Sequence, residues 1–210
     1  MRNPNFDNLL KVLKCEKPDR PTLFEFFLNG PLYEEIAGPK EEGSMADTKH
    51  LIKAFQKAGY DYVTMPGSNF AFPVKDVDHK STYSLNDGAY IVDWESFEKY
   101  EWPDPDSYDY SRLRDYENLL PPGMKIMLSG PCGVLENAIR LVGYENLCYI
   151  LSDDEKLAEA IFHEVGSRIL RYYENGIGYE SVGVLMGNDD WGFNTQTMIS
   201  PADMRKYVFP

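Results

Sequence analysis

The sequence predicts an α/β protein with parallel strands, because short apolar segments and amphipathic helices alternate along its 210 residues. Two segments, GYDYVTM and GYESVGVLM, repeat one unit in which a helix ends near a glycine and an apolar strand follows directly. Such alternation is typical of right-handed crossovers between parallel strands. Both an open doubly wound sheet and a closed (β/α)8 barrel satisfy the pattern. The phosphate-binding patterns GxGxxG and GxxxxGKS are absent, which weakens the case for a nucleotide-binding open sheet without excluding that fold.

Four strands are expected, near residues 22–28, 60–65, 125–129 and 182–187, each followed by a helix. The segment Thr22–Leu28 is aromatic and apolar without helical spacing, which is typical of a buried strand. Gly30-Pro31 closes this segment. The first strand is therefore expected to be fully covered.

Caps and apolar faces predict the helices. Capping boxes at Ser44–Asp47 and Ser152–Glu155 open two helices, whose apolar faces extend to Ala58 and to Tyr173. Gly59 and Asn175-Gly176 are expected to end them. The remaining helices are expected at Phe6–Leu13, from about Val134 to Leu141, and from Ser200-Pro201 onward.

A long insertion, about residues 66–122, follows the second strand. In it, Lys80–Leu85 and Ala89–Asp93 flank Asn86-Asp87-Gly88, which indicates a β-hairpin. Trp94–Tyr100 is expected to form a short helix, and WPDPD at 102–106 a rigid turn. The insertion is rich in acids between Glu95 and Glu117, a pattern typical of a solvated face.

Composition excludes several classes of partner. The chain has 34 Asp and Glu against 21 Lys and Arg, for a net charge of −13, so it repels nucleic-acid backbones and anionic membrane surfaces. It contains no apolar stretch of membrane-spanning length, and its polar N-terminus is unlike a signal peptide. The 3 cysteines form no CxxC pair, so we expect reduced thiols and a cytoplasmic protein. Cys148, in the apolar run NLCYIL, is expected in the core.

Four segments carry a family resemblance. They are GNDDWGFNTQTMISPADMRKYVFP at 187–210, LSGPCGVLENAIRLVGYENL at 128–147, the WPDPD turn, and RPTLFEFFLNG at 20–30. In this order they resemble the uroporphyrinogen decarboxylase superfamily, especially the branch that includes corrinoid-linked methyltransferases. The resemblance implies a (β/α)8 TIM barrel, of which residues 1–210 form a single domain holding about the first four βα units. A whole barrel typically takes ~250 residues. This chain, with its insertion, is therefore expected to be an incomplete and inactive half, and to self-associate.

Barrel enzymes place their chemistry at the carboxyl ends of the strands. That rule nominates Glu25, Asp189 and Asp190 as catalytic candidates. The substrate-binding candidates follow the same four strands: Phe27, Asn29, Ser68, Asn69, Cys132, Asn188, Trp191, Thr197 and Met198.

Each chemical interpretation has a structural alternative. Glu25 either points into the barrel mouth, where burial would raise its pKa, or is satisfied by a partner. Asp189 and Asp190 either coordinate a cation or transfer protons, or they cap the next loop. Cys132 either gains a lowered pKa from a helix N-terminus or is an inert small residue. Trp191 is either a packed wall or a stacking platform.

Departures from the family narrow the expected reaction. FEFFLNG stands where uroporphyrinogen decarboxylases carry an arginine-rich RQAGRY-like segment, and MPGSN replaces their Ser-Asp-Ile context. Without those arginines a polycarboxylate substrate is disfavoured. The methyltransferase branch implies a zinc-held thiol and a corrinoid partner protein or small-molecule methyl donor. Its His-x-Cys and later Cys ligands are not in this chain, so no cofactor is expected here, and zinc and corrinoid are expected only with the full-length protein. The alternatives are a decarboxylase or related lyase acting on a carboxylated substrate, and a non-enzymatic half-barrel assembly module.

Overall fold

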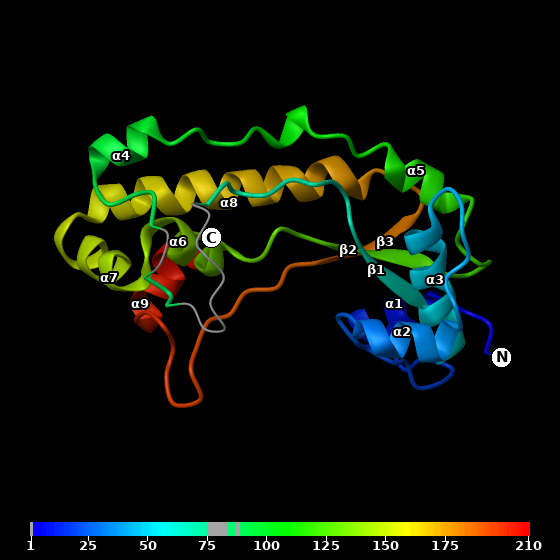
Figure 1. Cartoon of the computed structure of the whole chain (residues 1–210). Coiled ribbons are helices and arrows are strands. Elements are labelled where there is room, and N and C mark those ends of the chain that lie inside the picture. The colour runs from blue at the N-terminus through cyan, green and yellow to red at the C-terminus, as the bar shows by residue number, and fades with distance from the viewer. Residues whose placement is uncertain (1, 75–83, 87–88) are drawn as a thin grey trace. The chain divides into compact units, whose positions relative to one another are not determined.

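The computed structural model describes residues 2–74, 84–86 and 89–210, and the chain forms two compact units (Figure 1). Unit 1 contains Met1–Gly67, Tyr110–Ser129 and Gly176–Met186. Unit 2 contains Ser68–Asp109, Gly130–Asn175 and Gly187–Pro210. Each unit therefore combines three separate stretches of the chain.

Unit 1 holds a parallel sheet, ordered β1-β2-β3, of strands β1 (Tyr62–Pro66), β2 (Lys125–Ser129) and β3 (Val182–Met186). Met65 pairs with Leu128 across the first ladder, and Leu128 with Leu185 across the second. The protein is thus a mixed α/β protein. Three of the four expected strands are confirmed, each within two residues of its expected bounds.

The helices of unit 1 are α1 (Asp7–Leu13), α2 (Gly30–Ala37), α3 (Ala46–Ala58) and α5 (Arg112–Glu117). Phe55 of α3 is fully buried and packs on Tyr62 of β1, with ring centroids 6.1 Å apart. Ile126 and Leu128 of β2 are fully buried in the same core. Removing this apolar surface from water stabilises the sheet.

The prediction of a first strand is wrong: the residues Thr22–Leu28 are all described, and none of them belongs to a strand. Phe24 and Phe27 are 63% and 64% exposed, so this segment is not buried either. At Glu25, a side chain rather than a neighbouring strand satisfies the backbone. The Tyr62 hydroxyl accepts from the Glu25 N–H at 2.7 Å and donates to the Glu25 carbonyl at 2.8 Å. The first of the four expected βα units therefore lacks its strand.

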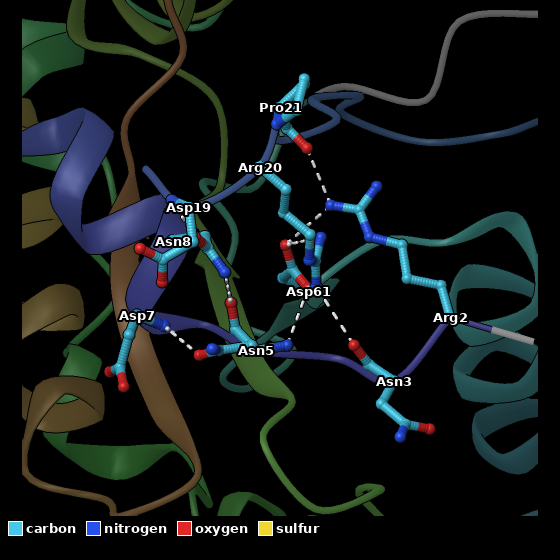
Figure 2. A network of polar contacts seen from close by, with 9 residues as sticks. All are labelled: Arg2, Asn3, Asn5, Asp7, Asn8, Asp19, Arg20, Pro21 and Asp61. Carbon is cyan, nitrogen blue, oxygen red and sulfur yellow. Dashed lines mark hydrogen bonds and ion pairs between the residues drawn. The ribbon is translucent and has the colours of Figure 1, made fainter. Parts of the chain in front are cut away.

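A buried carboxylate ties the N-terminal segment to the start of β1. Asp61 is 2% exposed and accepts hydrogen bonds from both terminal nitrogens of Arg20, at 2.6 and 3.1 Å. It also accepts from the Asn5 N–H at 2.8 Å, and Arg2 lies 3.6 Å away (Figure 2). A buried charge is tolerated when it is paired and hydrogen-bonded in this way.

Unit 2 is helical. Its elements are α4 (Trp94–Lys99), a 3-10 turn at Pro105–Ser107, α6 (Val134–Val142), α7 (Tyr144–Asp153), most of α8 (Glu155–Ile177), α9 (Pro201–Asp203) and a π-helical turn at Met204–Val208. Leu135, Leu147 and Ile161 are fully buried between the helices. The Phe162 ring of α8 stacks on Tyr207, with centroids 5.2 Å apart.

Several expected helix ends differ from the structure. Ser44 does not cap α3. The residue directly before the helix is Met45, which has a left-handed conformation with φ of 58° and makes no side-chain capping bond. The α8 cap is Asp154, which accepts from the Leu157 N–H at 3.1 Å, and Ser152 belongs to α7. Gly176 does not end α8; a Cβ there would lie 2.3 Å from Leu128, so the glycine instead allows the helix to approach β2 closely.

The expected helix and rigid turn after Asp93 are confirmed by α4 and the 3-10 turn. Asp87 and Gly88 of the expected turn, and most of the first arm of the hairpin, lie outside the described residues. Its second arm, Ala89–Asp93, is described and forms no strand; the N–H groups of Tyr90 and Ile91 both donate to the Leu141 carbonyl instead. Within the described part of the chain, no helix combines the length and apolar character needed to cross a membrane.

Candidate functional site

Asp189 caps the N-terminus of α6 from a distant part of the chain. Its two carboxylate oxygens accept from the N–H groups of Leu135 and Glu136, at 2.8 and 2.9 Å. Gly133, the residue before the helix, has no side chain that could do this. A carboxylate at a helix N-terminus satisfies free N–H groups and complements the helix dipole. Both oxygens are thus engaged in holding the segment after β3 against α6.

The close approach of Asp189 requires a glycine opposite it. A Cβ at Gly133 would lie 2.1 Å from both the Cβ and the Cγ of Asp189. The Gly133 N–H also faces the Glu136 carboxylate at 3.4 Å. The turn after β2 is therefore shaped around the segment that follows β3.

Cys132 precedes this turn in a left-handed conformation with φ of 69°. Its sulfur accepts from a guanidinium N–H of Arg140 at 3.4 Å. Burial raises the pKa of the Cys132 thiol, Arg140 opposes this, and the nearby Glu136 and Asp189 carboxylates add to the rise. Of the two interpretations of Cys132, the structure therefore disfavours a lowered thiol pKa and favours an inert small residue, because burial raises the pKa.

Asp190, which directly follows Asp189 in the sequence, is exposed, and its Oδ1 accepts from the Gly192 N–H at 3.3 Å. The preceding Asn188 is half-buried. Asp190 leaves more of its carboxylate open to a ligand than Asp189 does. The two adjacent acids therefore differ in what they can do: Asp189 holds structure, and Asp190 is available for proton transfer or ion binding.

The segment from Trp191 to Met198 folds back on itself. The Met198 N–H donates to the Trp191 carbonyl at 2.9 Å, and the Tyr144 hydroxyl donates to the Met198 carbonyl at 2.6 Å. Trp191 is 48% exposed and packs on Phe209 at 5.1 Å. The turn is fixed to α7 through Tyr144.

Thr197 and Met198 line a pocket of about 520 Å³, together with Cys148 and Ser152 of α7 and Ser200. This volume lies within the range of small-molecule sites, ~300–1,000 Å³. The expected burial of Cys148 is wrong: it is exposed, and all three cysteines are free. The pocket is the part of the candidate site best suited to a substrate.

The other candidates have mostly structural contacts. In unit 1, Glu25 is exposed, and its Oε1 accepts from the Phe26 N–H at 3.2 Å, so the expected burial is wrong. Asn29 caps α2 by accepting from the Leu32 N–H at 3.1 Å. In unit 2, Ser68 is 4% exposed and its hydroxyl accepts from the Phe70 N–H at 3.2 Å, whereas Asn69 is exposed. Phe27 contacts Phe26 edge-on at 5.3 Å.

The structure thus brings Cys132 and Asp189 together around the start of α6, and Trp191, Thr197 and Met198 in one turn. The sequence did not nominate Arg140, which donates to the Cys132 sulfur, or Tyr144, which donates to the Met198 carbonyl. It also missed α2, although Asn29-Gly30-Pro31 contains the signal of a helix start, a capping Asn followed by Pro in the first turn.

Charge is divided unequally between the two units. Unit 2 has 21 acidic and 9 basic residues, net −12, whereas unit 1 has 13 acidic and 12 basic residues, net −1. Together they give the net charge of −13.

Within the described ranges, no group of three or more His, Cys, Asp or Glu side chains is placed to hold a metal ion. No family model, curated protein or solved structure matches this chain.

Proposed function

We propose that this chain is the N-terminal part of a (β/α)8 barrel of the uroporphyrinogen decarboxylase superfamily, in the corrinoid-linked methyltransferase-like branch. The observation that carries the proposal is the sheet, whose three parallel strands neighbour one another in chain order. A barrel is built in that order, with polar residues after each strand. The four resembling segments noted above support the same assignment.

Within this proposal the site residues have different roles. Thr197 and Met198 contact the substrate in their pocket. Asp190 transfers a proton, because its carboxylate is exposed and makes one backbone contact. Asp189 positions the loop through its two bonds to α6.

The family resemblance implies a zinc-held thiol and a corrinoid partner. The described residues do not fit a zinc site: no metal-binding group is present among them, and the most buried thiol, Cys132, has a raised pKa. We therefore assign no zinc ligand to this chain. Zinc and the corrinoid partner belong, in this proposal, to the complete protein.

The test begins with the transcript beyond the codon for Pro210, followed by expression of the complete gene product. That protein is mixed with cob(I)alamin and, one at a time, methanol, methylamines and methoxylated aromatics, and methylcobalamin is followed by absorbance. We expect methyl transfer from one donor class, reduced about 10²-fold or more in Asp190→Asn and unchanged in the exposed control Glu42→Gln. Release of CO₂ from a carboxylated substrate without methyl transfer would instead establish a lyase.

A second candidate, a self-associating assembly module, is favoured by the apolar surface of unit 1. Leu23, Phe24 and Phe27 are 41%, 63% and 64% exposed. Exposed apolar groups of this size mark interaction surfaces. Light scattering of the 210-residue chain across concentrations tests this: we expect oligomers that dissociate in Phe24→Ser/Phe27→Ser, and a wild-type monomer at all concentrations would exclude the module.

A further inference from the structure

An acidic and aromatic pocket lies in unit 2, where the start of α4 meets the end of α7, and it shares no residue with the site described above. It encloses about 190 Å³. Its rim is formed by Val92, Asp93, Trp94, Tyr149, Asp153 and Asp154, and Ile150 and Leu157 form its floor. We call it the α4–α7 pocket.

The walls of the α4–α7 pocket are fixed by hydrogen bonds. The indole N–H of Trp94 donates to Oδ2 of Asp154 at 2.8 Å, and Oδ1 of the same carboxylate accepts from the Leu157 N–H at 3.1 Å. The Trp94 ring also contacts Phe97 edge-on at 5.6 Å. The pocket is thus formed before any ligand arrives, which reduces the entropy lost on binding.

Its apolar rim faces solvent. Val92, Trp94 and Tyr149 are 52%, 41% and 59% exposed, whereas Ile150 and Leu157 beneath them are 6% and 2% exposed. Two aromatic rings and a valine at one opening form a surface that a ligand would cover. The aromatic faces also attract cations.

Carboxylates complete the rim. Asp153 is exposed and forms no ion pair with any described residue. Hydrogen bonds from the backbone and hydroxyl of Ser96 lower the pKa of Asp93, so this carboxylate stays ionised. The lysines of this unit that form ion pairs are bound to other acids: Lys99 to Glu95, and Lys206 to Glu155 and Glu159. The rim therefore carries negative charge, and no described lysine or arginine forms an ion pair with Asp93 or Asp153.

The pocket is too small for a typical small-molecule site of ~300–1,000 Å³, but large enough for one guanidinium or ammonium head. A guanidinium suits it better, because it stacks flat on aromatic rings and bonds carboxylates with two parallel N–H groups. Unit 2 itself contains this arrangement: the Arg168 guanidinium lies 5.1 Å above the Trp102 ring.

We propose that the α4–α7 pocket receives an arginine side chain from a basic segment of a partner protein. The guanidinium stacks on Trp94 and Tyr149 and pairs with Asp153. The net charge of −12 on unit 2 attracts the rest of the segment and raises its association rate.

The test uses the whole 210-residue chain and fluorescence anisotropy. Three labelled peptides are titrated, with the repeats Gly-Ser-Arg, Gly-Ser-Lys and Gly-Ser-Ala. We expect the arginine peptide to bind severalfold more tightly than the lysine peptide, and the alanine peptide not to bind. Tyr149→Ala and Asp153→Lys should each weaken arginine-peptide binding by about five- to tenfold.

Glu42→Lys is the matched control, since it makes the same charge change on an exposed residue of unit 1. It should alter the affinity by less than about twofold. The proposal fails if Glu42→Lys weakens binding as much as Asp153→Lys, because the attraction would then be diffuse charge. It also fails if tetramethylammonium displaces the peptide at equal concentration, or if the arginine peptide does not bind. Because Asp153 is exposed and has no bonded partner among the described residues, its variant remains informative even if Tyr149→Ala unfolds.

Discussion

In each unit a carboxylate accepts two hydrogen bonds from one arginine side chain, and these two pairs differ in burial. In unit 1, Asp61 is 2% exposed and bonds Arg20 at 2.6 and 3.1 Å. In unit 2, Asp106 is 50% exposed and bonds Arg171 at 2.7 and 3.1 Å. Arg20 donates through Nη1 and Nη2 and Arg171 through Nε and Nη2, so both pairs have two hydrogen bonds, but solvent screens the second pair. The Asp61 pair therefore helps to fix the interior of unit 1, whereas the Asp106 pair lies on the surface of unit 2.

Removing the buried carboxylate should have the largest effect. Asp61→Ala leaves Arg20 and the Asn5 N–H without their shared acceptor, so we expect a loss of about 3 kcal/mol in the free energy of unfolding. Urea unfolding measures it. Asp19→Ala, which removes an exposed pair with Lys11 in the same unit, is the control and should cost less than about 1 kcal/mol. Equal losses in the two variants would show that burial does not distinguish them.

The next effect tests whether packing, rather than charge, fixes the interior of unit 2. Gly133→Ala places a methyl group 2.1 Å from Asp189, so the segment after β3 must move. We expect a loss of about 1–3 kcal/mol by urea unfolding, as for other overpacked sites. Gly166→Ala, on α8 in the same unit with no atom within 4 Å of the new Cβ, is the control and should not destabilise. A tolerated Gly133→Ala would mean that this segment is not held against α6.

A smaller effect isolates the cap itself. Asp189→Ala removes the acceptor for the Leu135 and Glu136 N–H groups and should cost about 1 kcal/mol. Asp189→Asn retains one acceptor oxygen and should cost less. Hydrogen exchange at those two N–H groups should become faster in Asp189→Ala, and exchange at its wild-type rate would contradict the capping role.

The sequence predicted the elements whose signals are local and apolar. The strands near residues 60–65, 125–129 and 182–187 and the long face of α8 are such elements, and the structure contains them. The segment 22–28 has the same composition but forms no strand, because its backbone bonds to the hydroxyls of Tyr62 and Tyr33. A strand depends on what lies beside it, which composition does not record.

The candidate site was harder to predict because its contacts join distant residues. The cap between Asp189 and Leu135 spans 54 residues, and the bond between Tyr144 and Met198 also spans 54. Asp189 and Asp190 are adjacent and chemically identical in sequence, yet only the first caps a helix. Position after a strand nominated both residues, but their separate roles depend on packing.

The smallest effect concerns the exposed pair of the opening comparison. Hydrogen bonds from Arg171 and Asn175 lower the pKa of Asp106 below its ordinary value of 3.8. Because the folded protein binds this proton less readily than the unfolded chain, the pair stabilises the protein above about pH 3.8, and the contribution is lost as the pH falls through the folded value. The thermal midpoints of the wild type and Asp106→Asn, followed by circular dichroism, should therefore differ slightly at neutral pH and converge in acid. A difference that persists unchanged to low pH would mean that the hydrogen bonds to Asp106, and not the charge of its carboxylate, stabilise the exposed pair. The two pairs would then differ in burial alone.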